Sequence, residues 1–249
     1  MAEPSTQMRQ FARLVLGEQV FGDEIERAAS AMSAADEKND RAGALREMIV
    51  RWRDVAHDGS AKPFSDAAVL AGTGAPPDDA QSVLLLNDVM GFSTDEICRI
   101  LDCAESDVPG LLQEGRKKYA SRASGNLVIV EDDPLIASDL EQIAEELGIE
   151  VQAVETKAEP AIEKILECRP DVVLLDFSLE GDKTGADVFN AIRERHDCAV
   201  IFVTAFPGEA LTGADMEPDL VIGKPYTDHA IRAAIAHALA HPRPALTVV

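Results

Sequence analysis

Two hydrophobic periodicities divide the chain near residue 125. From residue 126 onward, short runs of Val, Ile and Leu alternate with stretches in which apolar residues recur every three or four positions. The runs predict five strands, at Leu127–Val130, Ile149–Val154, Val172–Leu175, Val200–Val203 and Leu220–Ile222. The stretches between them predict helices at Leu135–Leu147, Ala161–Cys168, Ala186–Arg195 and Ala230–Ala240. Such alternation indicates one parallel sheet covered on both faces.

The first 125 residues show only the helical period. Apolar positions three and four apart predict short amphipathic helices at Met8–Leu16, Glu24–Met32 and Ala44–Trp52. Ala56–Ala80 is rich in Asp, Gly and Pro, which predicts a long connection with one helix around Ser65–Leu70. We therefore expect two domains: an all-α first domain, and an α/β second domain of the flavodoxin-like, doubly wound type with five parallel strands.

Three helical segments separated by short turns follow this connection. The first is expected at Ala80–Met90. Ser93 or Thr94 caps the second, with Glu96 reaching back to the cap, and the third begins near Glu105. Helix, short turn and helix at this spacing is the helix-turn-helix arrangement, which many DNA-binding proteins use.

The charge of the chain argues against DNA as its ligand. The formal net charge is −22, and residues 126–249 hold 9 Lys and Arg against 24 Asp and Glu. The helix that would enter the groove begins with the acids Glu105 and Asp107, and its Pro109 is tolerated only in a first turn. The basic run Arg116–Lys118 comes late, where it either contacts phosphates or complements the negative end of the helix dipole.

Other features exclude several classes of protein. No run of about 18 apolar residues predicts a membrane span, and the N-terminus lacks the apolar run of a signal peptide, so we expect a cytoplasmic protein. His237 and His241 stand four residues apart without a third metal ligand and are expected to be exposed. The four cysteines form no C-x-x-C pair and are expected to be buried, reduced thiols: Cys98, Cys103, Cys168 and Cys198.

Polar residues stand at the ends of four predicted strands. Parallel sheets bind ligands at the carboxyl ends of their strands, where Glu131, Asp132, Asp176 and Thr204 all lie. Asp132 and Asp176 can share one Mg²⁺ ion, and Glu131 can hold one of its waters. Asp176 ends the middle strand and is the candidate nucleophile for a phosphoryl group. Lys224 would supply positive charge to the phosphoryl oxygens, and Thr204 a hydrogen bond.

Residues 126–241 resemble a response-regulator receiver domain. The segments NLVIVEDDPLIA, DVVLLDFSLEGDKTGADV, VIFVTAF and GKPY match the acidic pair, phosphoacceptor strand, threonine strand and lysine turn of that family. The resemblance implies that a histidine kinase phosphorylates Asp176 and that Mg²⁺ is required. The implied metal ligands are Glu131, Asp132, Asp176 and the backbone carbonyl of Ser178.

Two departures from the receiver pattern stand out. Val221 occupies the position where receivers usually carry a switching aromatic residue. Pro207, Gly208, Gly213 and Pro218 weaken the helix expected between the threonine and lysine strands. Thr204 would therefore carry more of the switching.

Residues 80–122 resemble region four of extracytoplasmic-function sigma factors, and FARLVLGEQVFGDEIERA in residues 1–55 resembles a divergent region two. The expected boundaries are a linker at 56–79, the receiver at 126–241 and a tail at 242–249. A sigma-like domain placed before a receiver resembles the PhyR-type general stress response regulators. That resemblance implies an anti-anti-sigma factor: the sigma-like domain binds a NepR-type anti-sigma factor and frees a stress sigma factor for transcription, without touching DNA.

Three questions stay open at the level of sequence. Six apolar residues either line a groove for the anti-sigma partner or form the domain core: Leu84, Leu85, Val89, Phe92, Ile97 and Leu111. The helix-turn-helix also permits a response regulator that binds promoter DNA directly. A phosphatase of the haloacid dehalogenase type is disfavoured, because Ser178 stands where its general acid would be; no enzyme is expected.

Overall fold

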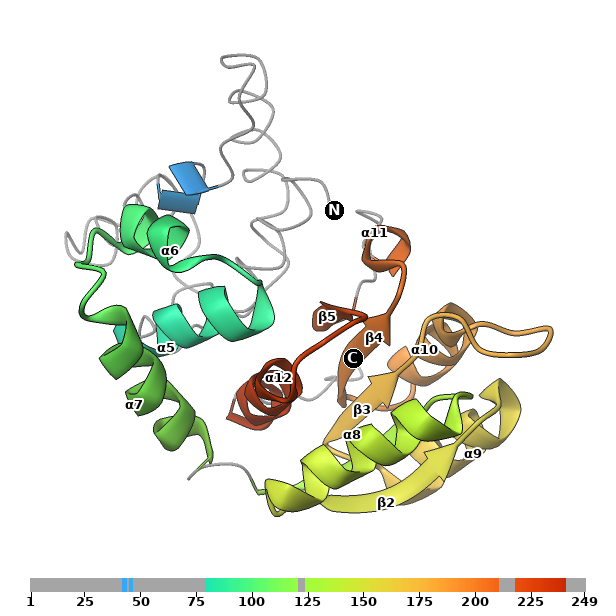
Figure 1. Cartoon of the computed structure of the whole chain (residues 1–249). Helices are drawn as coiled ribbons and strands as arrows, with labels where there is room; N and C mark the ends of the chain where they lie inside the picture. Colours follow the sequence, from blue (N-terminus) through green and yellow to red (C-terminus); the bar gives the residue numbers. More distant parts are fainter. Residues whose placement is uncertain (1–41, 44, 47–78, 121–123, 211–217, 241–249) are drawn as a thin grey trace, which may run out of the picture. The chain divides into compact units, whose positions relative to one another are not determined.

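The computed structural model describes residues 42–43, 45–46, 79–120, 124–210 and 218–240 (Figure 1). The chain forms two compact units, Met1–Arg116 and Lys117–Val249. The division falls inside helix α7 (Val108–Ala120), so the last turn of this helix belongs to the second unit. The helices predicted at Met8–Leu16 and Glu24–Met32 lie outside the described residues. The connection predicted at Ala56–Ala80 also lies outside them, except for Asp79 and Ala80, which belong to helix α5 (Asp79–Leu84). No helix in the described part of the chain is long and apolar enough to cross a membrane.

The first unit contains the predicted helix-turn-helix, with two corrections. The helix predicted at Ala80–Met90 consists of α5 (Asp79–Leu84) and a π-helical segment, η2 (Leu85–Val89). The third helix, α7, begins at Val108 rather than near Glu105, so Pro109 falls in its first turn, where proline is tolerated.

Helix α6 (Thr94–Leu101) begins with the predicted cap. The Ser93 hydroxyl accepts a hydrogen bond from the Glu96 amide at 3.4 Å, and the Glu96 carboxylate accepts from the Ser93 amide at 2.9 Å. This reciprocal pair satisfies two backbone donors that the helix itself leaves unpaired, which is why the local sequence sufficed to predict it.

Helix α7 packs closely on the helix that precedes α6. A Cβ atom added to Gly115 would lie 2.6 Å from the carbonyl oxygen of Ala80, so only glycine permits this approach. One residue later, Arg116 donates two hydrogen bonds of 2.8 Å to Asp88, whose side chain is 3% exposed. The guanidinium of Arg116 is therefore hydrogen-bonded within the first unit. Of the basic run Arg116–Lys118, this residue serves an ion pair rather than a contact with phosphates.

The second unit is the predicted flavodoxin-like fold. Its five strands are parallel and lie in the order β2-β1-β3-β4-β5, with β3 in the middle. The strands are β1 (Asn126–Val130), β2 (Glu150–Glu155), β3 (Val172–Leu175), β4 (Ala199–Thr204) and β5 (Leu220–Gly223). Every residue of β3 and β4 is buried, as continuous apolar runs in a sheet covered on both faces require.

Helices cover both faces of this sheet (Figure 1). Helices α8 (Pro134–Glu146) and α12 (Asp228–Ala240) pack together on one face, and α9 (Ala158–Cys168) packs beside α10 (Gly185–Arg193) on the other. Between β4 and β5 the described residues form only a four-residue helix, α11 (Pro207–Ala210). Residues 211–217, which include Gly213, lie outside the described residues, so the predicted weakening of the helix in this segment stays a prediction.

The prediction that His237 is exposed is wrong. His237 is 6% exposed, and its Nδ1 atom lies 3.0 Å from the hydroxyl oxygen of Tyr119, in the last turn of α7. Most residues of α12 are buried, and apart from His237 the buried ones are Ala and Ile. A polar residue on this helix therefore need not face solvent. His241 lies outside the described residues. The cysteines are free thiols, with Cys198 buried and the other three partly buried.

Candidate phosphoryl-acceptor site

The sheet brings the predicted acidic residues together at its carboxyl edge. Strands β1 and β3 are neighbours, and their chains leave the sheet toward opposite sides, which opens a space at this topological switch point. The ladder continues to the last residues: the Asp176 amide donates to the Val130 carbonyl at 2.8 Å, and the Glu131 amide to the Glu155 carbonyl at 2.9 Å. Both carboxylates are thus held by rigid strand ends.

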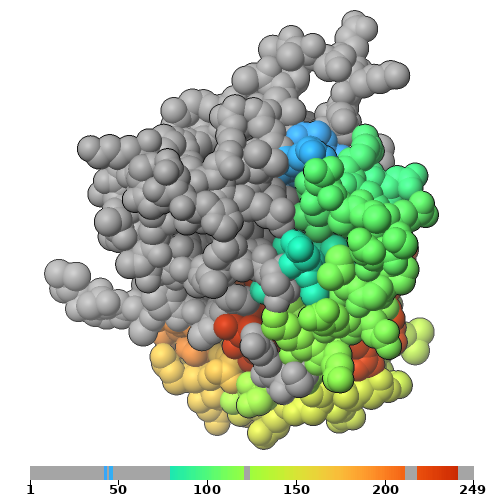
Figure 2. All heavy atoms as spheres, turned by 90° about the vertical axis from the view of Figure 1, so that its left-hand side faces the viewer, coloured from blue at the N-terminus to red at the C-terminus, as the bar shows by residue number. Residues whose placement is uncertain are grey.

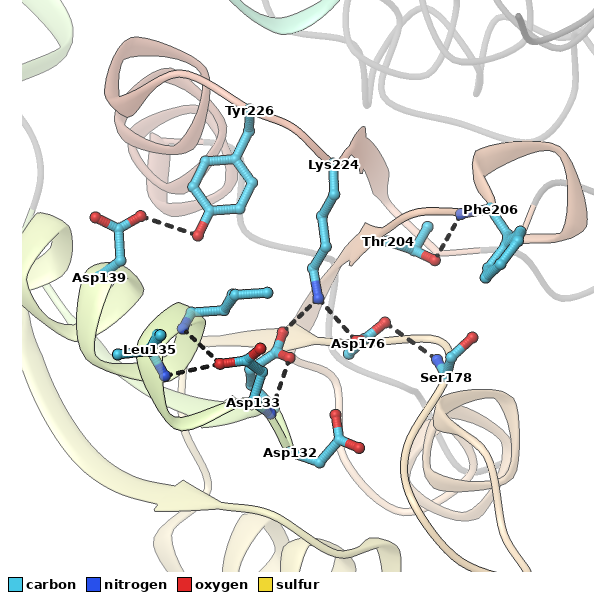
Figure 3. A network of polar contacts seen from close by, with 12 residues as sticks. Asp132, Asp133, Leu135, Asp139, Asp176, Ser178, Thr204, Phe206, Lys224 and Tyr226 are labelled. Atoms are coloured by element: carbon cyan, nitrogen blue, oxygen red, sulfur yellow. Dashed lines mark hydrogen bonds and ion pairs between the residues drawn. The ribbon is translucent and has the colours of Figure 1, made fainter.

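Lys224 enters this space from the end of β5. Its amide donates to the Thr204 carbonyl at 2.7 Å, and the Lys224–Pro225 peptide bond is cis. The Nζ atom donates to Glu131 Oε2 at 2.7 Å and to Asp176 Oδ2 at 2.8 Å, so it bridges the ends of β1 and β3 (Figure 3). The structure therefore joins three of the predicted site residues by charge-assisted hydrogen bonds.

These groups are shielded from water, which strengthens their mutual interaction. The side chains of Glu131, Asp176 and Lys224 are 1%, 9% and 15% exposed. Burial raises the pKa of the Glu131 carboxyl above its ordinary value, although the hydrogen bond from Lys224 opposes this shift. Burial alone would lower the pKa of Lys224, but its hydrogen bonds to Asp176 and Glu131 outweigh burial and raise it. The ammonium of Lys224 therefore stays charged beside its carboxylates.

The carboxylates at this edge have the composition of a magnesium site. One oxygen from each of Glu131, Asp132 and Asp176 lies within 4.8 Å of the others. Three carboxylates against one ammonium leave excess negative charge, and hard divalent cations such as Mg²⁺ prefer oxygen ligands of this kind. The residues present therefore fit such an ion.

The loop after Asp176 is tied to the same carboxylates. The Ser178 amide donates to Asp176 Oδ1 at 3.1 Å, and the Glu180 amide donates to Asp132 Oδ2 at 3.0 Å. These contacts orient both carboxylates. The predicted role of the Ser178 carbonyl as a metal ligand stays a prediction.

Gly185 is a site residue that the sequence-based prediction missed. It begins α10, and its amide donates to the Phe177 carbonyl at 2.9 Å. A Cβ atom here would lie 2.0 Å from the carbonyl oxygen of Asp176, closer than any two such atoms can approach. Glycine in the loop is the only signal in the sequence, and it does not show which backbone the loop folds against.

Thr204 lies at the predicted strand end, and its hydroxyl is hydrogen-bonded to the loop that follows the strand. Its side chain is fully buried, and Oγ1 accepts a hydrogen bond from the Phe206 amide at 3.0 Å (Figure 3). Phe206 is 51% exposed, whereas Val221, at the position usual for a switching aromatic, is buried within β5. The exposed aromatic ring in this region is therefore that of Phe206, whose amide donates to Thr204.

Five of the six residues considered for a partner groove are buried. Leu84, Leu85, Phe92 and Ile97 are at most 1% exposed, and Val89 is 9% exposed. Only Leu111, on α7, is partly exposed. The helices α6 and α7 form the continuous green surface in Figure 2. The five buried residues are core residues in this structure, and their role in binding a partner stays a prediction.

Comparisons with known proteins cover most of the chain. A family model described as the response regulator receiver domain matches residues 127–236. The phyllosphere-induced regulator PhyR of Methylorubrum extorquens (strain ATCC 14718 / DSM 1338 / JCM 2805 / NCIMB 9133 / AM1) is 31% identical over 243 residues, which span 93% of this chain and 90% of that protein.

Solved structures give the same match. The response regulator PhyR from Brucella abortus is 29% identical with a TM-score of 0.75, covering 95% of this chain and 91% of its own. The anti-anti-sigma factor PhyR from Bartonella quintana is 28% identical with a TM-score of 0.75, covering 96% and 94%. The Bartonella protein has also been co-crystallised with the anti-sigma factor NepR; that chain is 28% identical over 94% of each chain, with a TM-score of 0.35.

Proposed function

Because the chain belongs to the PhyR family of response regulators, we propose that phosphorylation of Asp176 switches it into an anti-anti-sigma factor. A sensor histidine kinase supplies the phosphoryl group. The sigma-like first unit is then released from the receiver and sequesters a NepR-type anti-sigma factor, which frees an extracytoplasmic-function sigma factor for transcription. The observation that carries this proposal is the buried bridge from Lys224 to Glu131 and Asp176 at the carboxyl edge of the sheet.

The chemistry at the site is a transfer of one phosphoryl group. A carboxylate oxygen of Asp176 attacks the phosphorus atom, the bond from phosphorus to the kinase histidine breaks, and an acyl-phosphate forms. Lys224 holds Asp176 Oδ2 and the Ser178 amide holds Oδ1, so the carboxylate is oriented before the reaction. Mg²⁺, held by Glu131, Asp132 and Asp176, would neutralise charge on the phosphoryl oxygens.

The phosphoryl group gives two side chains a new partner. Lys224 gains a doubly charged acceptor that competes with its bond to Glu131. The Thr204 hydroxyl, which accepts a hydrogen bond from the Phe206 amide, gains an acceptor for its own proton. Both changes act on the ends of β4 and β5. A shift from mostly closed to mostly open needs about 5.5 kcal/mol of differential stabilisation, to which the partner protein contributes.

Direct binding to DNA is the second candidate, and the first unit disfavours it. Arg116 is held by the buried Asp88, and α7 begins with no basic residue in its first turn. Without cations aimed at phosphates and base edges, a helix supplies neither affinity nor sequence recognition. Promoter binding that weakens steeply with salt would favour this candidate instead.

The proposal is tested by measuring binding to a purified NepR-type anti-sigma factor with and without a phosphodonor. Wild type is expected to bind tightly only when phosphorylated, and Asp176→Asn is expected to stay weak under both conditions. The matched control is Asp182→Asn, which changes an exposed acid in the same loop and should behave as wild type. Equal binding by wild type with and without the phosphodonor would refute release by phosphorylation.

A further inference from the structure

Tyr119 and His237 form a buried polar pair within the second unit. Each residue is 6% exposed, and the Tyr119 hydroxyl oxygen lies 3.0 Å from His237 Nδ1. Their ring centroids are 6.1 Å apart with an interplanar angle of 45°. The two residues are 118 positions apart in sequence, so the contact joins the end of α7 to α12.

A polar pair here is not what packing alone requires. His237 is the polar residue in the run Ala233–Ala240, where the other side chains are Ala, Ile and Leu. An apolar side chain would bury as well at this position without leaving a nitrogen in need of a partner. The hydrogen bond makes the contact directional, because it forms only when the last turn of α7 lies at one place along α12.

Helix α12 connects this pair to the phosphoryl-acceptor site. The helix begins at Asp228, four residues after Lys224, and between them Tyr226 donates a hydrogen bond of 3.0 Å to Asp139 on α8. Further along, Arg232 pairs with Glu146 at the end of α8. Helix α12 is continuous from Asp228 to Ala240, so the segment that begins after Lys224 also carries His237.

Helix α7, which carries Tyr119, also carries Gly115 and Arg116. The helix is continuous from Val108 to Ala120. Within the first unit it is fixed by the close approach at Gly115 and by the ion pair between Arg116 and Asp88. Within the second unit Tyr119, three residues later, is bonded to α12.

We propose that Tyr119 and His237 are the positioning residues through which the state of Asp176 reaches α7. While Lys224 is bonded to the Asp176 carboxylate, α12 holds His237 where it bonds Tyr119. When a phosphoryl group draws Lys224 to itself, α12 shifts and this bond weakens, which releases the last turn of α7. The inference rests on the proposed function and assigns the regulatory step within it to two named side chains.

The test uses full-length variants that change this contact. Tyr119→Phe removes the hydroxyl and keeps the ring, and His237→Leu removes the ring nitrogen. His237→Asn returns an amide group near the position of Nδ1 and should restore much of the wild-type behaviour. His229→Leu makes the same change as His237→Leu at an exposed position on the same helix and serves as the matched control.

The readout is the affinity for a purified NepR-type anti-sigma factor, with and without acetyl phosphate and Mg²⁺. Tyr119→Phe and His237→Leu should each raise the affinity of the unphosphorylated protein roughly fivefold, the worth of one buried hydrogen bond. The phosphorylated protein should be unchanged, so the ratio between the two states shrinks. The double variant should add nothing to either single one. Amide exchange in α7 should rise in parallel in the unphosphorylated variants.

Two outcomes overturn the inference. In one, the variants keep the full wild-type ratio between phosphorylated and unphosphorylated protein. In the other, both states lose affinity equally, which marks a contact that serves folding only. These outcomes are distinct from failure of the proposed function, which would appear as a wild type whose affinity does not respond to the phosphodonor.

Discussion

Each unit of the chain buries charged groups, but the two sets are balanced differently. In the first unit, the carboxylate of Asp88 is matched by the guanidinium of Arg116 through two hydrogen bonds of 2.8 Å. In the second unit, Glu131, Asp132 and Asp176 lie together with the single ammonium of Lys224. The first set pairs one cation with one anion and is neutral, whereas the second has more carboxylates than cations and is negatively charged.

The type of cation suits each balance. A guanidinium presents a rigid, planar fork, so Arg116 is bound to one carboxylate in one geometry. An ammonium is a point charge on a flexible stem, so Lys224 can turn from Glu131 or Asp176 toward a new anion without losing its charge. The Arg116 pair is therefore matched one to one, whereas the carboxylates around Lys224 outnumber their cation.

The largest expected effect comes from breaking the closed pair. Arg116→Met leaves the nearly inaccessible carboxylate of Asp88 without its partner, and should lower the free energy of unfolding of the first unit by about 3 kcal/mol. Denaturant titration monitored by circular dichroism measures this change in the free energy of unfolding. Lys117→Met, an exposed neighbour on the same helix, is the control and should cost little. A loss no larger in Arg116→Met than in this control would show that the pair is not structural.

Adding Mg²⁺ sharpens the comparison from the other side. The surplus of carboxylate in the second unit should bind the ion, and a concentration 100 times the dissociation constant stabilises a folded protein by about 2.7 kcal/mol. Asp132→Asn should weaken this stabilisation, because it removes one of the three clustered carboxylates. Thermal unfolding of both proteins with and without Mg²⁺ gives the measurement. Equal stabilisation of Asp132→Asn and wild type would place the ion elsewhere.

A third prediction concerns the backbone around the carboxylates of the second unit. Gly185→Ala places a methyl group 2.0 Å from the Asp176 carbonyl oxygen, and relieving such overpacking costs about 1–3 kcal/mol. The displaced loop should also slow phosphorylation of Asp176. Gly208→Ala is the control, since nothing lies within 4 Å of a Cβ atom there. Stability and phosphorylation rate like those of the control would mean that the loop adapts freely.

Much of the receiver could be predicted from sequence because its signals are local. Alternating apolar runs placed the strands within one or two residues, and the polar residues that follow them identified the edge where a ligand binds. The capping of α6 followed from Ser93 and Glu96 for the same reason. The close approach of Gly185 to the chain could not be predicted, because it depends on how a loop folds back.

The partners of buried polar groups needed the tertiary structure. The basic run at Arg116 had two interpretations until packing placed its guanidinium against a residue 28 positions away. His237 was predicted to be exposed, and six apolar residues could have lined a groove or formed a core. In each case the composition of the helix is compatible with either environment.

The sequence by itself therefore determined the helical and α/β parts of the fold, the order of the strands along the chain and the polar residues at the strand ends. Periodicity and capping act over a few residues, and strand ends of a parallel sheet always share one edge. Only the tertiary structure decided that Lys224 bridges Glu131 and Asp176, that Arg116 is closed on Asp88 and that Tyr119 meets His237. These contacts join residues far apart in sequence, and which of them form depends on how whole helices and strands pack.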